Sequence, residues 1–198
     1  YVDKWVVDCD ISVTNIILRN NTVGISDYAF SDCSSLTSIT IPKNVKSIGD
    51  SAFYYCSRLN QFLVAEGNTV YHSAGNCLIK TYEKILIAGC KSSIIPTDGS
   101  VTSIGACAFS GCNNLTSITI PNNVTSIGNL AFSDCSRLAS ITIPKSVTSI
   151  DYLAFSGCSN LTNITYTGTK AQWNAISKGY SDWNGAVTCS DGITSYNE

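Results

Sequence analysis

The sequence predicts a β-rich solenoid, a single domain in which short repeats stack as rungs and build a parallel sheet. The first observation is a motif, Ile-x3-Ala-Phe-x2-Cys-x2-Leu-x2-Ile-x-Ile, that recurs along the 198 residues. The second is its constant spacing of 23 residues within each block of repeats. The third is that one such unit cannot bury its own apolar face, so neighbouring units must cover it.

The motif occurs five times, and its strongest positions form three aligned series. Stacking the units in register would place like residues on like residues in buried columns. The members of these columns are Phe30, Phe53, Phe109, Phe132 and Phe155; Cys33, Cys56, Cys112, Cys135 and Cys158; and Leu36, Leu59, Leu115, Leu138 and Leu161.

Each repeat contains one short strand. In "LTSITIP", Ile118 and Ile120 alternate with Ser117 and Thr119, and Pro121 ends the strand because proline has no N–H for a ladder. The segment "SIGxxAFSxC" is then expected to return the chain through short turns or helical pieces on the convex side. About seven strands can be placed, centred near Ile16, Ile39, Phe62, Ile94, Ile118, Ile141 and Ile164.

One unit in the middle is irregular. The step from Phe53 to Phe109 is 56 residues, which is two repeats of 23 plus ten. "CLIKTYEKILI" reads as two short apolar strands around 81–84, a small hairpin that would project Tyr82 at its tip. The stretch "SIIP" at 93–96 then recovers the strand register.

The chain is expected to form one repeat domain with distinct ends. Thr169 precedes Gln172 by three residues, a capping-box spacing that predicts a short helix with Trp173 and Ile176 on one side. Such a helix would cover the apolar edge of the last rung, and Trp5 would do the same at the first. The expected parts are a degenerate repeat at 1–21, two repeats at 22–67, the irregular repeat at 68–100, three repeats at 101–169 and a C-terminal cap at 170–198.

The repeat resembles the BspA-like leucine-rich repeat family of bacterial and protozoan surface proteins. The resemblance rests on Leu-x2-Ile-x-Ile-Pro-x2-Val-x2-Ile-Gly-x3-Phe-x2-Cys and covers nearly the whole chain. Residues 168–189, "GTKAQWNAISKGYSDWNGAVTC", look like the usual C-terminal end of that family. The resemblance implies a curved solenoid, an extracellular or cell-surface location and binding of host or matrix proteins or glycans.

The composition excludes several classes of function. Charged residues make up 13% of the chain and the formal net charge is −2, so no basic face for nucleic acid is expected. No apolar run approaches the ~20 residues that span a bilayer, so we expect no transmembrane segment. Because residues 13–18 already belong to a rung, we expect the chain to be part of a longer protein that carries its leader and anchor elsewhere.

Ten cysteines admit two interpretations. A disulfide framework is one. The favoured one is that the five repeat cysteines are reduced thiols in a buried column, because free cysteine behaves as a small hydrophobe. Cys77 and Cys90 flank the expected hairpin and are the pair most suited to a bridge. The sequence does not decide the state of the remaining cysteines, Cys9, Cys107 and Cys189.

The sequence contains no pattern typical of catalysis. His72 is the single histidine, and it lies in a loop-like stretch without a nucleophile motif. His72, Cys77 and Cys90 could be drawn as zinc ligands, but no paired ligand spacing supports such a site. We therefore expect a non-enzymatic protein without metal or cofactor.

The candidate binding residues lie on the outward face of the strands and in the irregular unit. Side chains alternate along a strand, so inward Ile118 places Ser117 and Thr119 outward. This face is either a binding surface or simply a soluble, β-compatible ladder. Side chains that break the uniformity are better suited to specific recognition. The candidates are Leu63, Tyr71, His72, Tyr82, Ser117, Thr119, Ser140 and Thr142.

The function expected from these observations is an extracellular interaction module of a larger surface or secreted protein. Its partner would be a protein or a glycan, and the chain is expected to be monomeric. The alternative is a structural spacer that holds another domain away from the cell and has no ligand of its own.

Overall fold

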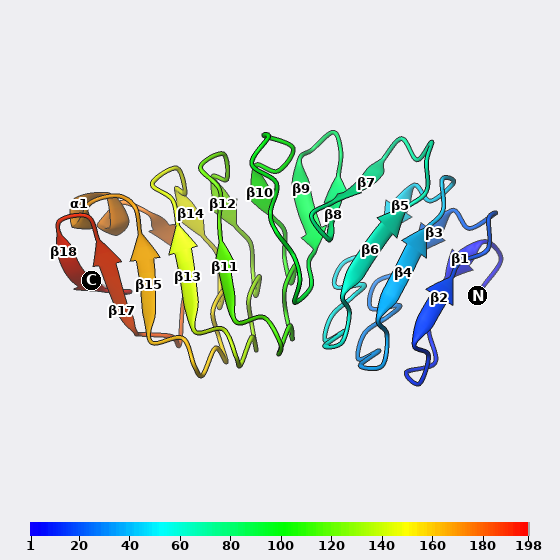
Figure 1. The fold of residues 1–198 in the computed structure, drawn as a ribbon, viewed down its shortest axis with the longest axis horizontal. Coiled ribbons are helices and arrows are strands. Elements are labelled where there is room, and N and C mark those ends of the chain that lie inside the picture. The colour runs from blue at the N-terminus through cyan, green and yellow to red at the C-terminus, as the bar shows by residue number, and fades with distance from the viewer. Residues whose placement is uncertain (198) are drawn as a thin grey trace.

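The computed structural model describes residues 1–197 and is a solenoid of about eight turns with 23-residue repeats (Figure 1). The two termini lie at opposite ends of the stack. Each regular turn contributes one strand to a principal row and a shorter strand to a second row. The predicted repeat solenoid is therefore confirmed.

The principal row follows the expected outward and inward alternation. Its strands pair in parallel without a shift, so that Ile141 of one rung faces Ile118 and Ile164 of its neighbours. The row consists of two separate sheets, each ordered as the chain runs. The first contains β2 (Asn15–Ile17), β4 (Ser38–Ile41) and β6 (Gln61–Val64); the second contains β11 (Ser117–Thr119), β13 (Ser140–Ile143), β15 (Asn163–Tyr166) and β17 (Ala186–Cys189).

The second row was not predicted. The "SI" dipeptides, expected in turns, form two-residue parallel strands that pair from rung to rung, as Ser103–Ile104 does with Ser126–Ile127. In this row Gly128 donates its N–H to the Ile104 carbonyl at 2.9 Å. The strands are β1 (Trp5–Val6), β3 (Gly24–Ile25), β5 (Ser47–Ile48), β10 (Ser103–Ile104), β12 (Ser126–Ile127), β14 (Ser149–Ile150) and β16 (Ser177–Lys178).

The irregular unit folds as an antiparallel meander. Its strands are β7 (Tyr71–Ala74), β8 (Cys77–Lys80) and β9 (Ile85–Ala88), and β9 joins the second row by parallel pairing with β10. The predicted hairpin with Tyr82 in its turn is therefore confirmed. The meander separates an N-terminal block, residues 1–67, from a C-terminal block, residues 101–197 (Figure 1).

The strand expected near Ile94 is absent from the structure, and that prediction was wrong. The N–H of Ile94 donates to the carbonyl of Gly75 at 2.8 Å, and Asn76 donates to the carbonyl of Ser92 at 3.3 Å. These bonds hold residues 92–94 against the turn between β7 and β8, and no ladder with β6 forms. The ten extra residues therefore interrupt the principal row between β6 and β11.

Each second-row strand of a regular repeat is followed by a loop that contains the phenylalanine of the repeat, such as residues 128–134. We call it the Phe loop. Two of its residues have left-handed backbone, at positions four apart such as Leu130 (φ 53°) and Asp134 (φ 56°). The loop points N–H groups at the next rung. Those of Cys107, Phe109 and Gly111 each donate to one carbonyl of the following loop, at 2.9, 2.7 and 2.8 Å. The acceptors are Asn129, Ala131 and Ser133.

The predicted phenylalanine column forms within each block but does not continue between them. Phe109 and Phe132 stack with centroids 5.1 Å apart, and Phe132 and Phe155 at 5.7 Å. Phe53 instead packs edge-on against Phe62. Phe109 meets Gly89, where a Cβ would lie 2.0 Å from the ring. The column is interrupted because the meander occupies the place of a regular rung.

The core is correspondingly divided into two clusters, and β8 is the wall between them. Leu78 packs with the buried residues of the N-terminal block, whereas Cys77 and Ile79 pack with those of the C-terminal block. All three side chains are fully buried. Because successive strand residues point to opposite faces, β8 can serve both clusters at once.

The cysteine column is buried, as predicted, and its thiols have a common partner. Cys56, Cys135 and Cys158 donate S–H bonds to the carbonyls of the phenylalanines of the preceding rung, at 3.0 to 3.1 Å. Cys112 does the same to Gly89 at 3.6 Å. The repeat cysteine thus joins rungs through a weak hydrogen bond as well as by packing. All ten cysteines are free thiols in the structure.

We expect native thiol labelling to divide the cysteines into two groups. Cys9 and Cys107 are partly exposed and the other eight are buried. Burial raises the pKa of Cys33 and of Cys77 to about 12, so these thiols stay protonated at pH 8 and react poorly. Mass spectrometry after iodoacetamide treatment should find native modification at Cys9 and Cys107, and modification of all ten only in denaturant. Rapid native labelling of Cys112 or Cys135 would contradict the buried column.

The C-terminal end is closed by the predicted helix and by a hairpin that was not predicted. α1 (Lys170–Asn174) begins with the expected capping box at Thr169, and its Trp173 is fully buried. Trp183 donates its indole N–H to the Leu161 carbonyl at 2.7 Å. β17 adds an eighth turn, and β18 (Gly192–Ser195) pairs with it in antiparallel fashion and ends the row.

Trp5 covers the N-terminal turn less completely than Trp173 covers the other end. Its side chain remains 38% exposed, and its ring lies against Gly24, where a Cβ would come within 2.5 Å. The five-residue α1 illustrates the near absence of helix: across residues 1–197 there is none with the length and apolarity needed to cross a membrane.

Candidate binding surface

The outward Ser/Thr ladder lies where the sequence predicted it. Ser117 is paired with Ser140 and Thr119 with Thr142 in the parallel register of β11 and β13. Ser117, Thr119 and Ser140 are exposed, and Thr142 is half-buried. The intervening Ile118 is buried. The alternation of the strand therefore presents hydroxyl groups as a regular row.

Two adjoining hollows make this part of the surface concave. One, of about 290 Å³, lies between the 93–97 segment and the open edge of β11. The other, of about 340 Å³, continues from it toward Thr167. Thr97, Thr119 and Pro121 line both hollows. We call the combined feature the sheet groove. It contains three of the predicted residues, Ser117, Thr119 and Thr142.

The interruption of the principal row creates the groove. No strand in residues 1–197 pairs with β11 on the side opposite β13, so the 93–97 segment forms a wall and not another rung. Ile94 projects from this wall with 76% of its side chain exposed. The repeat pattern placed Ile94 at a strand centre and gave no sign of its position at a surface hollow. The extra ten residues of the unit were the available signal.

The predicted residues of the irregular unit and of the neighbouring β6 are not brought into the groove. Leu63, on β6, is 42% exposed and Tyr82, in the hairpin turn, is 95% exposed. His72 is half-buried, and its Nδ1 lies 2.9 Å from the Thr81 hydroxyl. These three residues are accessible, but they belong to separate parts of the meander and its flank.

Tyr71 departs from the expectation of an accessible aromatic. Its side chain is only 3% exposed, and it packs with the buried residues of the N-terminal block. Burial raises the pKa of its phenol. The period-two alternation of β7 turns Tyr71 inward and leaves His72 facing outward. Tyr71 is thus a core residue and cannot contact a partner from its present position.

The groove has no charged side chain among its lining residues, which are serine, threonine, isoleucine, proline and asparagine. The ion pair within the described part of the chain is Lys80 with Glu83, 2.8 Å apart in the hairpin turn. Residues 1–197 contain no group of histidine, cysteine or acidic side chains that could hold a metal ion. The arrangement is suited to contact with a neutral surface.

Comparison with known proteins gives one family and several solved structures of the same fold. A family model described as "BspA type Leucine rich repeat region" matches in six copies, over residues 7–80 and 80–179. No curated protein matches the sequence. A leucine rich cell surface protein from Faecalibacterium prausnitzii A2-165 is 27% identical, with a TM-score of 0.53, over 87% of this chain and 60% of that one.

Two further solved structures share the fold. A leucine-rich repeat protein from Eubacterium ventriosum ATCC 27560 is 24% identical, with a TM-score of 0.59, over 78% of this chain and 54% of that one. The pneumococcal vaccine antigen PcpA is 22% identical, with a TM-score of 0.68, over 86% of this chain and 49% of that one. The chain therefore spans about half to three fifths of the length of these similar chains.

Proposed function

Because the chain belongs to the BspA type leucine-rich repeat family, we propose that it is a non-enzymatic interaction module of a larger extracellular surface protein. We place the binding surface at the sheet groove. The observation that carries this proposal is the joined, uncharged hollow beside the irregular unit, where the otherwise uniform ladder changes shape. Recognition requires such local differences in shape and chemistry.

Two findings support an extracellular location. The 27% identical protein from Faecalibacterium prausnitzii is described as a cell surface protein. The surface of the present chain is also rich in hydroxyl and amide side chains and poor in charge, with 13% charged residues overall. The outward ladder of β11 and β13 is an example of this chemistry.

The lining of the groove favours a protein ligand over a glycan. Ile94, Pro121 and Pro144 give it apolar surface, while Ser117 and Thr119 offer hydroxyl groups at its floor. Interfaces between proteins combine an apolar centre with neutral hydrogen-bonding groups in this way. The groove has neither an aromatic ring nor a carboxylate to hold a sugar.

A spacer function is the second candidate, and a specific observation favours it. Ser117 and Ser140 occupy one outward position, and Thr119, Thr142 and Thr165 occupy another. A ladder that repeats the same residues from rung to rung carries little information for recognition. In that case the chain would set the distance between other domains, and the groove would remain empty.

The proposal is tested in two steps. An array of matrix proteins and glycans is first probed with the protein, and matched variants of the protein are then compared for binding to each hit. Thr119→Lys is expected to weaken binding of a protein hit at least tenfold, because the ammonium would have to be desolvated in the contact. Thr165→Lys is the control, since Thr165 occupies the same exposed position two rungs away and does not line the groove. Surface plasmon resonance would give both affinities.

A second pair tests the apolar wall. Ile94→Asp should reduce binding at least tenfold, whereas Ile193→Asp, in the terminal hairpin and 67% exposed, should leave it unchanged. Equal loss in both members of either pair would remove the groove from the interface. A glycan hit with these dependences would replace the protein ligand, and an array without hits would favour the spacer.

A further inference from the structure

The junction of the two blocks lacks backbone hydrogen bonds that other rungs make. In the N-terminal block, Tyr28, Phe30 and Asp32 donate their N–H groups to carbonyls of the next Phe loop at 3.1, 2.9 and 2.9 Å. The equivalent donors one rung later are Ser51, Phe53 and Tyr55. Only Tyr55 finds an acceptor in the next loop, the carbonyl of Ser110 at 3.4 Å.

Ser51 and Phe53 therefore present unpaired N–H groups within the described chain of 1–197. On the facing loop, the Ala108 carbonyl is taken by the N–H of Gly89 at 2.7 Å, and the Ala106 carbonyl has no donor among the same residues. The two loops meet at Tyr55 and Ser110 and diverge toward Ser51 and Ala106. The divergence leaves a wedge-shaped opening, which we call the junction cleft.

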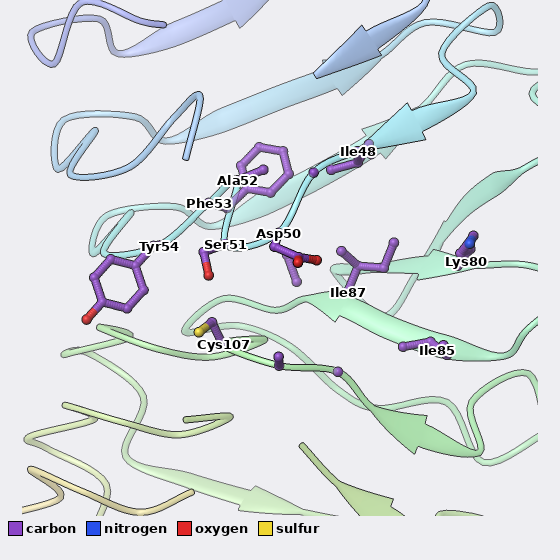
Figure 2. Close-up of a pocket in the computed structure, with 14 residues that line it drawn as sticks. Ile48, Asp50, Ser51, Ala52, Phe53, Tyr54, Lys80, Ile85, Ile87 and Cys107 are labelled. Carbon is purple, nitrogen blue, oxygen red and sulfur yellow. The ribbon is translucent and has the colours of Figure 1, made fainter. Parts of the chain in front are cut away.

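The junction cleft is a defined cavity of about 290 Å³. One wall is 49–54, the other is 105–107, and the floor is formed by apolar side chains of the meander, including Ile85, Ile87 and Ala88. Figure 2 shows Ser51 and Cys107 on opposite walls, with Ile87 between the two segments. None of the residues that line it also lines the sheet groove.

We propose that the junction cleft binds an extended segment of another polypeptide by backbone pairing. Two N–H groups that are two residues apart, opposed by a free carbonyl, form the edge of a ladder, and an added strand satisfies such an edge. The segment would accept from Ser51 and Phe53 and donate to Ala106. The small apolar floor admits side chains no larger than a few carbons.

The charges at the cleft argue against a simple anion site. Lys80 reaches its rim, but its ammonium is already paired with Glu83 at 2.8 Å. Asp50 contributes a carboxylate to the same rim. A neutral peptide backbone can lie beside the Lys80 ammonium and the Asp50 carboxylate without adding a further charge to the cleft. The volume, at the lower limit of ordinary ligand pockets, matches a few residues of a longer chain and not a folded domain.

The repeat itself supplies a probe. Residues 128–133, "GNLAFS", fill the equivalent position at a regular junction, where Ala131 accepts from Phe109 at 2.7 Å. In the probe the phenylalanine is replaced by alanine, because the meander already occupies the core beneath the cleft. The peptide is fluorescein-GNLAAS-amide. The control is fluorescein-GNPAPS-amide, in which prolines remove two N–H groups and restrict the backbone.

Two protein variants localise the binding. Ala106 is exposed and lines the cleft, so Ala106→Trp should fill the opening without disturbing the core. Asn129 occupies the same repeat position one rung later, where the loops are already paired, and Asn129→Trp is the matched control. Circular dichroism checks the fold of each. If Ala106→Trp does not fold, Ile87→Trp replaces it as the blocking variant.

Anisotropy should show saturable binding of GNLAAS to the wild type and to Asn129→Trp, and at least tenfold weaker binding to Ala106→Trp. Saturating GNLAAS should also slow alkylation of Cys107, a cleft residue, at least tenfold, while partly exposed Cys9 reacts at its usual rate. Equal binding of GNPAPS, unchanged binding to Ala106→Trp, or no binding would overturn the proposal. If the free chain dimerises and Ala106→Trp abolishes the dimer, the cleft binds a second copy of the chain, and this outcome would also overturn the proposal.

The proposal for the sheet groove and the proposal for the junction cleft can be tested separately. The groove variant Thr119→Lys should bind GNLAAS as the wild type does, because Thr119 is absent from the cleft. Ala106→Trp should likewise leave unchanged the affinity of the protein for any array hit that binds at the groove. Loss of peptide binding in Thr119→Lys would contradict the assignment of two independent sites.

Discussion

Replacing Phe132 with alanine is expected to destabilise the protein by about 3–5 kcal/mol, the scale for emptying a large buried site. Its side chain is fully buried and stacks with Phe109 on one side and Phe155 on the other. Both aromatic contacts of the column would be lost at once. Chemical denaturation followed by circular dichroism measures the change.

The location of the damage is as informative as its size. Each rung contacts mainly its neighbours, so protection from hydrogen exchange should fall most in the C-terminal block and least around β2 and β4. Phe30→Ala, in the other stacked pair with Phe53, is the counterpart and should reverse this pattern. A uniform loss of protection in either variant would contradict the division into two blocks.

Truncation of the two neighbouring side chains of β8 is expected to act on opposite halves of the molecule. Leu78→Ala should loosen the N-terminal block and Ile79→Ala the C-terminal block, each at a cost of about 2–5 kcal/mol for a buried aliphatic side chain. The reason is that Leu78 belongs to one core cluster and Ile79 to the other. Hydrogen exchange resolved by peptide would show which rungs lose protection.

Val64→Ala is a suitable reference for this pair. Val64 lies on β6, next to the meander, but is only partly buried against the N-terminal cluster, so a smaller loss confined to that side is expected. Identical exchange patterns for Leu78→Ala and Ile79→Ala would mean that the core is continuous and that β8 is not a wall.

The regular part of the fold was predictable because its signal is repeated. Ile118, Ile141 and Ile164 recur at one spacing, and the structure pairs them in one register. The burial of the phenylalanine and cysteine columns follows from the same periodicity. The capping helix was predictable for a different reason, because Thr169 and Gln172 carry a local signature that does not depend on the rest of the chain.

The second row and the loops escaped prediction because their conformations leave little trace in sequence. A two-residue strand is too short for an alternating pattern. The left-handed residues of the Phe loops include Tyr28, Ser51 and Leu130, whereas such backbone is usually associated with glycine. Here the bonds between successive rungs hold the conformation, so it depends on stacking and not on the local residues.

The candidate surface was predicted in part. Ser117, Thr119 and Thr142 follow from strand alternation, and the structure places them along the sheet groove. The exposed Ile94 and the buried Tyr71 both lie in the irregular unit, where a single copy provides no internal comparison. The junction cleft could not be predicted either, because it consists of backbone groups that a missing neighbour leaves free.

The peptide dipoles of the Phe loops share one direction along the solenoid. Their cross-rung bonds all run from an N–H of the earlier rung to a carbonyl of the later one, as from Phe132 to Ala154 at 2.8 Å. Aligned peptide dipoles add, as they do along a helix, so their positive ends point toward the C-terminus. There the Asp182 carboxylate accepts from Ser156 at 2.8 Å, beside the last loop of the series. Bonds beside the strands, such as that from Gly128 to Ile104, run the opposite way, so the two sides of each rung carry opposed dipoles that the net charge of −2 does not reveal.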